Sequence, residues 1–151
     1  MKYTIAPATE GDAYIVAKYM RDEDAAEVIA EGWSPIDALL QSMAASREPM
    51  AWRADGEPLC LFGIAAPTIL STVGVPWILT TRNLPQHWRP FLRGSRKWIE
   101  QVRQEYALLV NCVDARYRLA LDWLEWLGFE IGEPEPFGPF GLPFCRAELR
   151  S

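Results

Sequence analysis

Apolar residues recur at helical spacing in several segments of this chain. In the first segment, four of them follow the i, i+3, i+4, i+7 pattern that gives a helix one buried stripe: Ala13, Val16, Ala17 and Met20. Residues that favour helix ends flank these segments, with Thr9 and Ser34 as N-caps and Gly128 as a C-cap. The pattern predicts helices over Glu10 to about Tyr19, Asp24–Ala30, Pro35 to about Ala45, Trp88 to about Tyr106, and Ala115–Leu127.

Between the helices lie short apolar runs that predict strands. Asp55-Gly56 between two such runs is a hairpin turn sequence. The nearly unbroken apolar run from Ala107 to Val113 is typical of a central strand that is covered on both faces. Glu133 to Pro143 is rich in proline and glycine and is expected to form an irregular loop. The predicted strands are Tyr3–Ala6, Met50–Ala54, Pro58–Ile64, Val75–Thr80, Ala107–Val113, Phe129–Ile131 and Phe144–Leu149.

This order of elements predicts an α/β fold in which helices flank a central mixed sheet. The stretch from Val75 to Val113 is expected to form two neighbouring parallel strands that are joined by a long helix and splayed to leave a cleft. We find no internal repeat, linker or low-complexity tract, so residues 1–151 are expected to form one domain.

Charge and hydropathy exclude several classes of partner. The chain has 15 Lys and Arg against 20 Asp and Glu, a formal net charge of −5, which disfavours sequence-independent binding of nucleic acid. No run of about 18 apolar residues occurs, and the N-terminus does not resemble a signal peptide. We therefore expect no nucleic-acid partner, no membrane association and a cytoplasmic location in the bacterial cell that makes the protein.

The residue types that carry hydrolase or metal chemistry are sparse. The three cysteines are widely spaced within apolar runs, which favours core packing over a disulfide framework. There is one histidine, no metal-ligand spacing, and no clear Ser-His-Asp set, so no metal site is expected. The acidic cluster Asp22-Glu23-Asp24 is interpreted as the solvated, favourable start of a helix.

Two segments resemble the GNAT superfamily of N-acetyltransferases. Ile5–Asp12 is similar to the strand-to-helix entry of that fold, and Val113–Phe129 is similar to its last helix, which ends in Gly-Phe. Taken with Gly56–Gly63 and Val75–Thr81, the pattern most resembles the small phage proteins grouped with internal virion protein A of short-tailed phages. The resemblance spans nearly the whole chain and implies a GNAT-like acyl-CoA N-acyltransferase fold.

The resemblance also implies a cofactor and its site. Active members of the superfamily transfer an acyl group from a donor such as acetyl-CoA to an amine. Backbone amides of the fourth strand polarise the thioester carbonyl, and a glycine-rich loop after that strand holds the pyrophosphate at a helix N-terminus. In this sequence the loop lacks the spaced glycines, and Pro85 and Pro90 have no amide hydrogen. The residues that correspond to the cofactor site are Ile78, Leu79, Thr80, Thr81, Gln86, His87 and Arg89.

Three residues are candidates for catalytic roles. Many family enzymes carry a tyrosine four residues before the glycine of Gly-Phe, where this chain has Leu124. Tyr117, at the start of the same helix, is the candidate replacement acid, and packing of its ring on the sheet is the alternative. Asn111 and Asp114 fall at the exit of the central strand, where ligands bind in open α/β sheets. Asp114 is equally suited to cap the following helix.

Several other features have plain alternative interpretations. His87 is either a phosphate contact or an exposed loop residue, and Arg89 lies on a helix face that is otherwise expected to be solvated. Aromatic residues near the C-terminus, among them Trp126 and Phe140, are candidates for a protein-binding surface.

Two functions from different classes therefore remain open. The first is acetyl transfer from acetyl-CoA to a small-molecule or protein amine acceptor. The second is a catalytically inactive phage protein that binds a host or virion protein, with a location in the virion as a further expectation.

Overall fold

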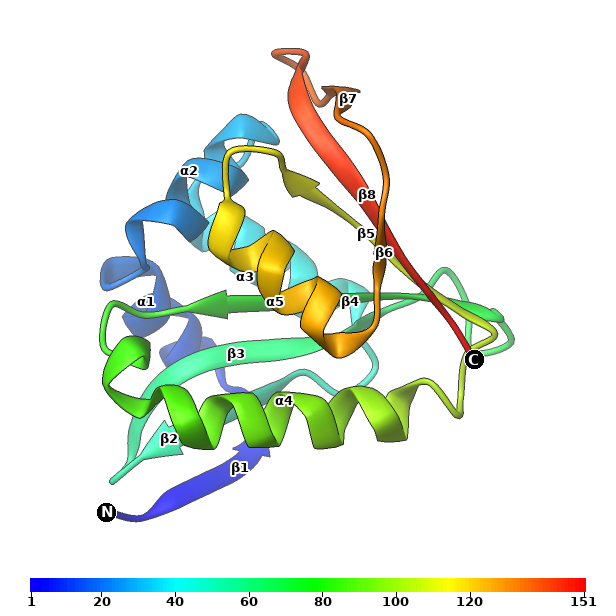
Figure 1. The fold of residues 1–151 in the computed structure, drawn as a ribbon. Coiled ribbons are helices and arrows are strands. Elements are labelled where there is room, and N and C mark those ends of the chain that lie inside the picture. Colours follow the sequence, from blue (N-terminus) through cyan, green and yellow to red (C-terminus); the bar gives the residue numbers. More distant parts are fainter.

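A mixed sheet of eight strands runs through the molecule in the order β1-β2-β3-β4-β5-β8-β6, with β7 paired to β8 (Figure 1). The structure is a computed structural model that describes residues 1–151. The strands are β1 Tyr3–Pro7, β2 Met50–Ala54, β3 Glu57–Ala65, β4 Val73–Thr80, β5 Leu108–Asp114, β6 Glu130–Ile131, β7 Glu135–Phe137 and β8 Leu142–Arg150.

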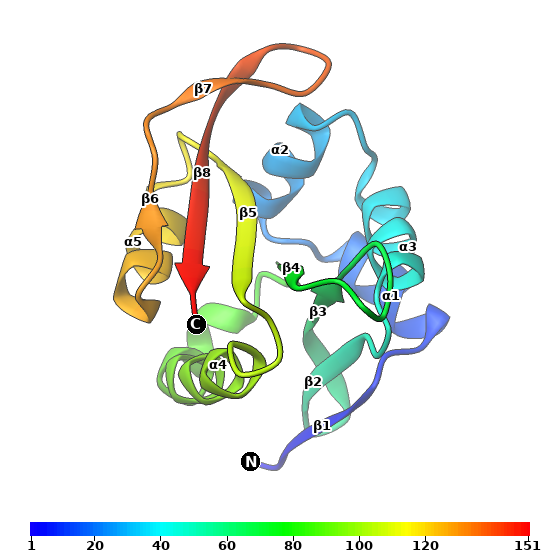
Figure 2. The same ribbon diagram turned by 90° about the vertical axis from the view of Figure 1, so that its right-hand side faces the viewer.

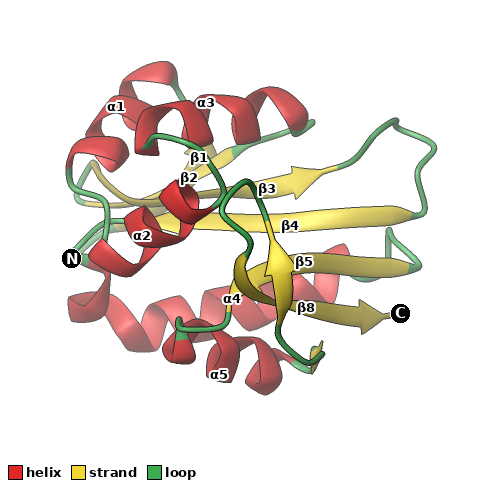
Figure 3. Ribbon diagram, turned by 90° about the horizontal axis from the view of Figure 1, so that it is seen from above, coloured by secondary structure: helices red, strands yellow, loops and turns green.

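Five α-helices and one short 3₁₀ helix cover the sheet. They are α1 Glu10–Lys18, α2 Asp22–Ala30, α3 Pro35–Ala45, the 3₁₀ helix η1 Leu84–His87, α4 Trp88–Val102 and α5 Arg118–Leu127. Helices α1, α2 and α3 lie on one face of the sheet and α4 and α5 on the other (Figure 3). The strand β3 is buried on both faces: Leu61 packs in the cluster with α1 and α3, and Phe62 packs in the cluster with α4. A third cluster lies between α4, α5 and the strands β5 and β8.

The predicted local signals form as expected. The Thr9 hydroxyl accepts a hydrogen bond from the Asp12 amide, and the Asp12 carboxylate accepts one from the Thr9 amide, which is a capping box. Asp55 and Gly56 both have positive φ, 49° and 86°, as a two-residue hairpin turn between β2 and β3 requires. Gly128 ends α5 in the left-handed conformation.

The central prediction is confirmed, since β4 and β5 are neighbouring parallel strands joined by the crossover through α4. Figure 2 shows the long helix α4 below the two strands that it connects. Gly74 lies where they meet, and a Cβ atom there would come within 2.8 Å of Ile64 and 3.1 Å of Tyr106. The packing of the Ile64 and Tyr106 side chains over this position therefore leaves room for glycine alone.

Several predicted boundaries are wrong. The helix α2 begins at Asp22 instead of Asp24, β4 at Val73 instead of Val75, and β8 at Leu142 instead of Phe144. The long helix ends at Val102 instead of near Tyr106, because the amides of Gln104 and Glu105 bond three residues back and tighten the chain into a turn. The last helix begins at Arg118 instead of Ala115. The expected irregular loop contains β7, which pairs with β8 in a hairpin.

Candidate functional site

The two parallel strands pair only where they begin. Val73 lies opposite Leu108 and Gly74 opposite Leu109, and beyond these positions β4 and β5 diverge (Figure 1). A cavity of about 90 Å³ lies in this opening, which we call the splay cavity. Most of its walls are apolar. Its polar lining residues are Arg21, Asp24, Glu27, Thr80, Asn111 and Tyr117.

The edge of β4 presents alternate backbone groups to this cavity. The Thr81 amide donates to the Leu59 carbonyl of β3 at 2.9 Å. Backbone groups of successive residues point to opposite sides of a strand, so those of Leu79, two residues earlier, also point toward β3. Ile78 and Thr80 therefore turn their backbone groups away from β3, toward β5. No hydrogen bond engages the Ile78 backbone on that side. Of the four predicted strand residues, these two face the splay cavity.

Asn111 bridges the two strands close to where they separate. Its side-chain Nδ2 donates to the Pro76 carbonyl at 2.7 Å, and its Oδ1 accepts from the Cys112 amide at 2.7 Å. Both polar ends of the side chain are thus used within the protein. The structure places Asn111 in the wall of the cavity as a cross-strand contact.

Asp24 of α2 caps the edge of β4. Its Oδ2 accepts from the Thr80 amide at 2.7 Å and from the Thr80 hydroxyl at 2.6 Å, and the residue is 6% exposed. Burial raises the pKa of Asp24, and its hydrogen bonds with Thr80 and Tyr117 act in the opposite direction. Asp24 is thus a buried part of the site, and the interpretation of its acidic cluster as a solvated helix start is wrong for this residue.

The segment between α1 and α2 also pairs with the end of β4, through backbone hydrogen bonds. The Arg21 amide donates to the Thr80 carbonyl at 2.9 Å, and the Arg82 amide donates to the Tyr19 carbonyl at 3.0 Å. Met20 and Thr81 form an antiparallel bridge between these bonds. The end of β4 is therefore paired with the chain itself, and Ile78 is the open position.

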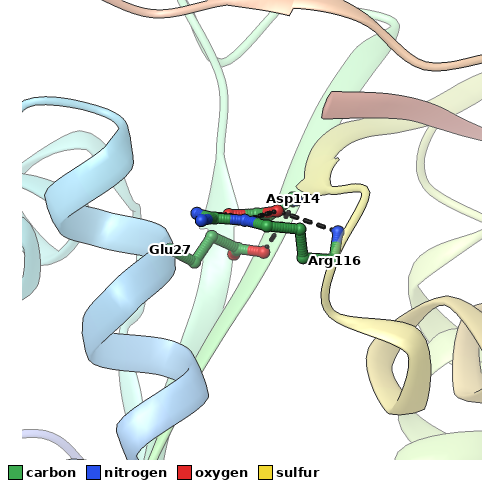
Figure 4. Close-up of polar contacts among 3 residues, drawn as sticks. All are labelled: Glu27, Asp114 and Arg116. Atoms are coloured by element: carbon green, nitrogen blue, oxygen red, sulfur yellow. Dashed lines mark hydrogen bonds and ion pairs between the residues drawn. The ribbon is translucent and has the colours of Figure 1, made fainter. Parts of the chain in front are cut away.

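Glu27, one helical turn after Asp24, reaches the other strand. Its Oε2 accepts from the Asp114 amide at the end of β5 at 3.0 Å (Figure 4). The Asp114 carboxylate is bound in turn by the Arg116 amide at 2.9 Å and by the Arg116 guanidinium at 2.7 Å. Asp114 does not cap α5, whose N-cap residue is Tyr117. These bonds hold residues 114–116 in a turn, so the helix starts later than predicted.

The carboxylates that converge here perturb one another. Burial raises the pKa of Glu27 to about 8, and the nearby negative charges of Glu31, Asp24 and Asp114 add to the effect. Burial and the Asp114 charge raise the pKa of Glu31 to about 7. The hydrogen bonds from Arg116 lower the pKa of Asp114. Glu27 therefore changes its charge close to neutral pH, as a general base requires.

Tyr117 lies half-buried between the same groups. Burial raises the pKa of its hydroxyl above the ordinary value, and the adjacent Asp24 carboxylate raises it further. The hydroxyl thus keeps its proton at neutral pH. It lines the splay cavity together with Asp24 and Glu27, and the structure brings these three side chains together.

The predicted phosphate loop is compact and partly used for packing. Residues Leu84–His87 form the 3₁₀ helix η1, in which Gln86 is exposed, and Arg89 is exposed in the first turn of α4. His87 is only 9% exposed, and its Nδ1 is hydrogen-bonded to the Tyr3 hydroxyl of β1 at 2.7 Å. The interpretation of His87 as an exposed loop residue is therefore wrong.

Sequence reasoning missed the acidic face of α2. Asp24, Glu27 and Glu31 are three and four residues apart, so they lie along one side of the helix. That spacing is the only sign in the sequence that these carboxylates share a helix face. It does not show which strands the face contacts, because Asp24 bonds to Thr80, 56 residues away, and Glu27 bonds to Asp114, 87 residues away.

Two further properties concern membranes and metals. None of the helices combines the length and the apolar content that crossing a bilayer requires. No three side chains of His, Cys, Asp or Glu converge as a metal-binding group.

Comparison with known proteins identifies the architecture. No protein-family model matches the sequence, and no curated protein matches it. Solved structures do match. The ribosomal-protein-S18-alanine N-acetyltransferase from Escherichia coli has a TM-score of 0.67 at 14% identity, with 99% of this chain and 94% of that chain covered.

Two more structures show the same likeness. An acetyltransferase of the GNAT family from Streptococcus pneumoniae has a TM-score of 0.62 at 12% identity over 99% of this chain and 100% of that chain. The protein yncA from Salmonella typhimurium, solved with its cofactor acetyl-CoA, has a TM-score of 0.65 at 14% identity over 99% and 94%. The mixed sheet with its splayed parallel strands and flanking helices thus has the fold of the GNAT acetyltransferases.

Proposed function

We propose that this protein transfers an acyl group from an acyl-CoA donor, with acetyl-CoA as the simplest, to an amine. The observation that supports this most directly is the convergence of Glu27, Tyr117 and the open backbone edge at Ile78 on one cavity. The cavity lies between the splayed parallel strands of a fold that yncA shares, and yncA was solved with acetyl-CoA.

The residues present fit the acyl end of such a donor better than its phosphates. If each non-hydrogen atom takes about the 30 Å³ of a water molecule, a cavity of about 90 Å³ takes about three atoms, the number in an acetyl group. At the other end of the donor, Arg82 and Arg89 offer exposed guanidinium groups beside η1, and such groups suit phosphate oxygens. They would have to replace the backbone donors of a glycine-rich loop.

The groups of the chain divide the chemistry between them. The donor supplies a thioester, whose carbonyl carbon is open to attack by an amine. The ionised Glu27 carboxylate accepts a proton from the ammonium form of the acceptor, and the carboxylates around it favour that cation at the cavity. The Ile78 amide is placed to donate a hydrogen bond to an oxygen in the cavity. As the amide bond forms, the bond between the carbonyl carbon and sulfur breaks, and the Tyr117 hydroxyl, protonated at neutral pH, is the proton donor to the CoA thiolate that leaves.

Two measurements test this function. Thermal unfolding with acetyl-CoA at about a hundred times its dissociation constant should show about 2.7 kcal/mol of added stability. Thiol release from acetyl-CoA, followed with a panel of primary amines and peptides, should increase as the pH rises through about 8, where Glu27 ionises.

A matched pair of variants makes the second measurement specific. Glu27→Gln should lower kcat/KM by a factor of about 10² or more. Glu23→Gln changes an exposed carboxylate of the same helix, which pairs with Arg21 at 3.3 Å, and should change the rate far less than Glu27→Gln does. If the protein binds acetyl-CoA and Glu27→Gln keeps full activity, Glu27 has no part in the mechanism. If acetyl-CoA does not bind at all, the proposed function is refuted.

A second candidate is a catalytically inactive protein that binds a partner, such as a phage virion component or a factor that engages a host protein. The closure of the β4 edge by Asp24 and by the Arg21 amide supports it, since the chain occupies a position next to the proposed donor. Trp126 and Phe140 offer exposed aromatic surface, 43% and 65%, for a partner. An unfolding temperature that acyl-CoA does not change would favour this function over the first.

A further inference from the structure

A second and larger cavity lies beside the splay cavity, between α4 and the face of β2 and β3. Its volume is about 440 Å³, within the range of about 300–1,000 Å³ that is usual for small-molecule sites. We call it the α4 groove. Ile5 of β1 forms part of its open side and is 59% exposed.

The groove exists because aromatic rings separate α4 from the sheet. Phe91 on α4 packs against Trp52 of β2 with ring centroids 6.2 Å apart, and Trp98 packs edge-on against Phe62 of β3 at 5.0 Å. Gly94 lies between these two contacts along the helix. A Cβ atom at Gly94 would meet nothing within 4 Å, so the absent side chain leaves the space open.

The α4 groove adjoins the splay cavity. Four residues line both of them: Ile78, Phe91, Trp98 and Trp123. Ile78 is also the residue whose backbone is open toward the splay cavity. A ligand with its reacting end beside Ile78 therefore has an apolar space next to it, much larger than an acetyl group fills.

The lining of the groove selects an uncharged, apolar ligand. The Ser95 hydroxyl, its buried polar group, already donates to the Leu92 carbonyl at 3.0 Å and accepts from the Trp123 indole at 3.2 Å. Lys97 and Gln101 are exposed residues at the margin. With no free polar partner inside, a polar ligand would lose its hydration without compensation, whereas an alkyl chain would gain from burial.

We propose that the α4 groove binds the alkyl chain of a medium-chain acyl group, so that the preferred donor carries an acyl chain longer than acetyl. At about 30 Å³ for each non-hydrogen atom, about 440 Å³ holds roughly 15 atoms, enough for a ten-carbon chain. The proposal rests on the proposed acyl transfer for the source of the chain. The groove itself is formed by α4 and the sheet, and its presence does not depend on the proposed function.

The test uses Gly94, where an added Cβ atom would meet no atom of the protein within 4 Å. Gly94→Phe should fill the groove, and Gly94→Ala is the matched control that adds one methyl group. Dissociation constants for acetyl-CoA and decanoyl-CoA are measured by calorimetry below the micelle concentration. Sodium decanoate is titrated separately against tryptophan fluorescence, since Trp52, Trp98 and Trp123 line the groove.

We expect decanoyl-CoA to bind the natural chain at least tenfold more tightly than acetyl-CoA. Gly94→Phe should abolish this difference and Gly94→Ala should keep it, with both variants shown to be folded by circular dichroism. Equal affinities for the two donors, or a preference that survives Gly94→Phe, would overturn the proposal.

The decanoate titration separates the two possible failures. If neither CoA ester binds, the proposed acyl transfer fails, and decanoate binding that Gly94→Phe abolishes would show that the groove takes an alkyl chain from a free fatty acid. If decanoate also fails to bind, the groove proposal is wrong. If acetyl-CoA is used as a donor without any preference for chain length, the proposed function stands and the groove proposal alone is refuted.

Discussion

Glu27 should make the stability of this protein fall as the pH rises. Its pKa is raised from the ordinary value of 4.5 to about 8, because burial disfavours its charged form and the charges of Glu31, Asp24 and Asp114 repel it. Between these two pH values the folded state binds a proton that the unfolded state has released. The contribution is therefore complete below about pH 4.5 and is lost as the pH passes about 8.

The size of the effect has an upper limit. A difference of about 3.5 pKa units, from 4.5 to about 8, corresponds to about 5 kcal/mol at about 1.36 kcal/mol per unit. Glu27 is half-buried at a cavity wall, so solvent and relaxation reduce this value. We expect a loss of about 1–3 kcal/mol in the free energy of unfolding between pH 5 and pH 9. Glu31, with a pKa raised to about 7, contributes in the same direction.

Urea unfolding at half-unit intervals of pH measures this directly. Glu27→Gln should remove most of the loss and leave the smaller part from Glu31 and Asp24, whose pKa values are also raised. Glu23→Gln, on the exposed side of α2, should follow the natural chain. If the natural chain has the same unfolding free energy at pH 5 and pH 9, Glu27 is not perturbed as described. A Glu27→Gln variant with an unchanged pH profile would assign the dependence to other groups.

Two further substitutions test the packing around the site. Asp24→Ala leaves the Thr80 amide and hydroxyl without their partner and should cost about 1–3 kcal/mol in urea unfolding. Asp22→Ala, which removes only an exposed ion pair with Arg82, should cost under about 1 kcal/mol, and equal losses for the two would contradict the role given to Asp24. Leu61→Ala at a fully buried position of β3 should cost about 2–5 kcal/mol in the same assay, and a loss well below that would show that the core relaxes around the deletion.

Local chemistry explains which elements the sequence could predict. Thr9 and Gly128 act within a few residues of themselves, so their caps can be recognised without knowledge of the fold. The hairpin at Asp55-Gly56 is local in the same sense. The parallel crossover from β4 to β5 could also be predicted, because two strands separated by a long helix have few other arrangements.

The candidate site could be predicted only in part, because its polar contacts join distant segments. The sequence placed Asn111 at the exit of the central strand and Tyr117 at the start of the last helix. The structure finds both in the cavity wall, with Asn111 in the middle of β5. It could not show that α2 turns its acidic face toward the two strands. His87 likewise bonds to Tyr3 of β1, 84 residues away, and the residues next to His87 in the sequence do not indicate such a bond.

The distribution of charge around the sheet gives each substrate of the proposed reaction its own approach. Asp24 and Glu27 lie on α2, on the face of the sheet that also carries α1 and α3 (Figure 3). Arg89 and Arg93 lie exposed on α4, on the opposite face. An anionic donor is attracted to the second face, and a cationic amine is attracted to the first once Glu27 ionises, as the pH passes about 8. In the proposed reaction the two meet at the splay cavity. Asp24, bonded to Thr80 between the two approaches, is therefore the residue whose removal should most directly widen access to the Ile78 edge.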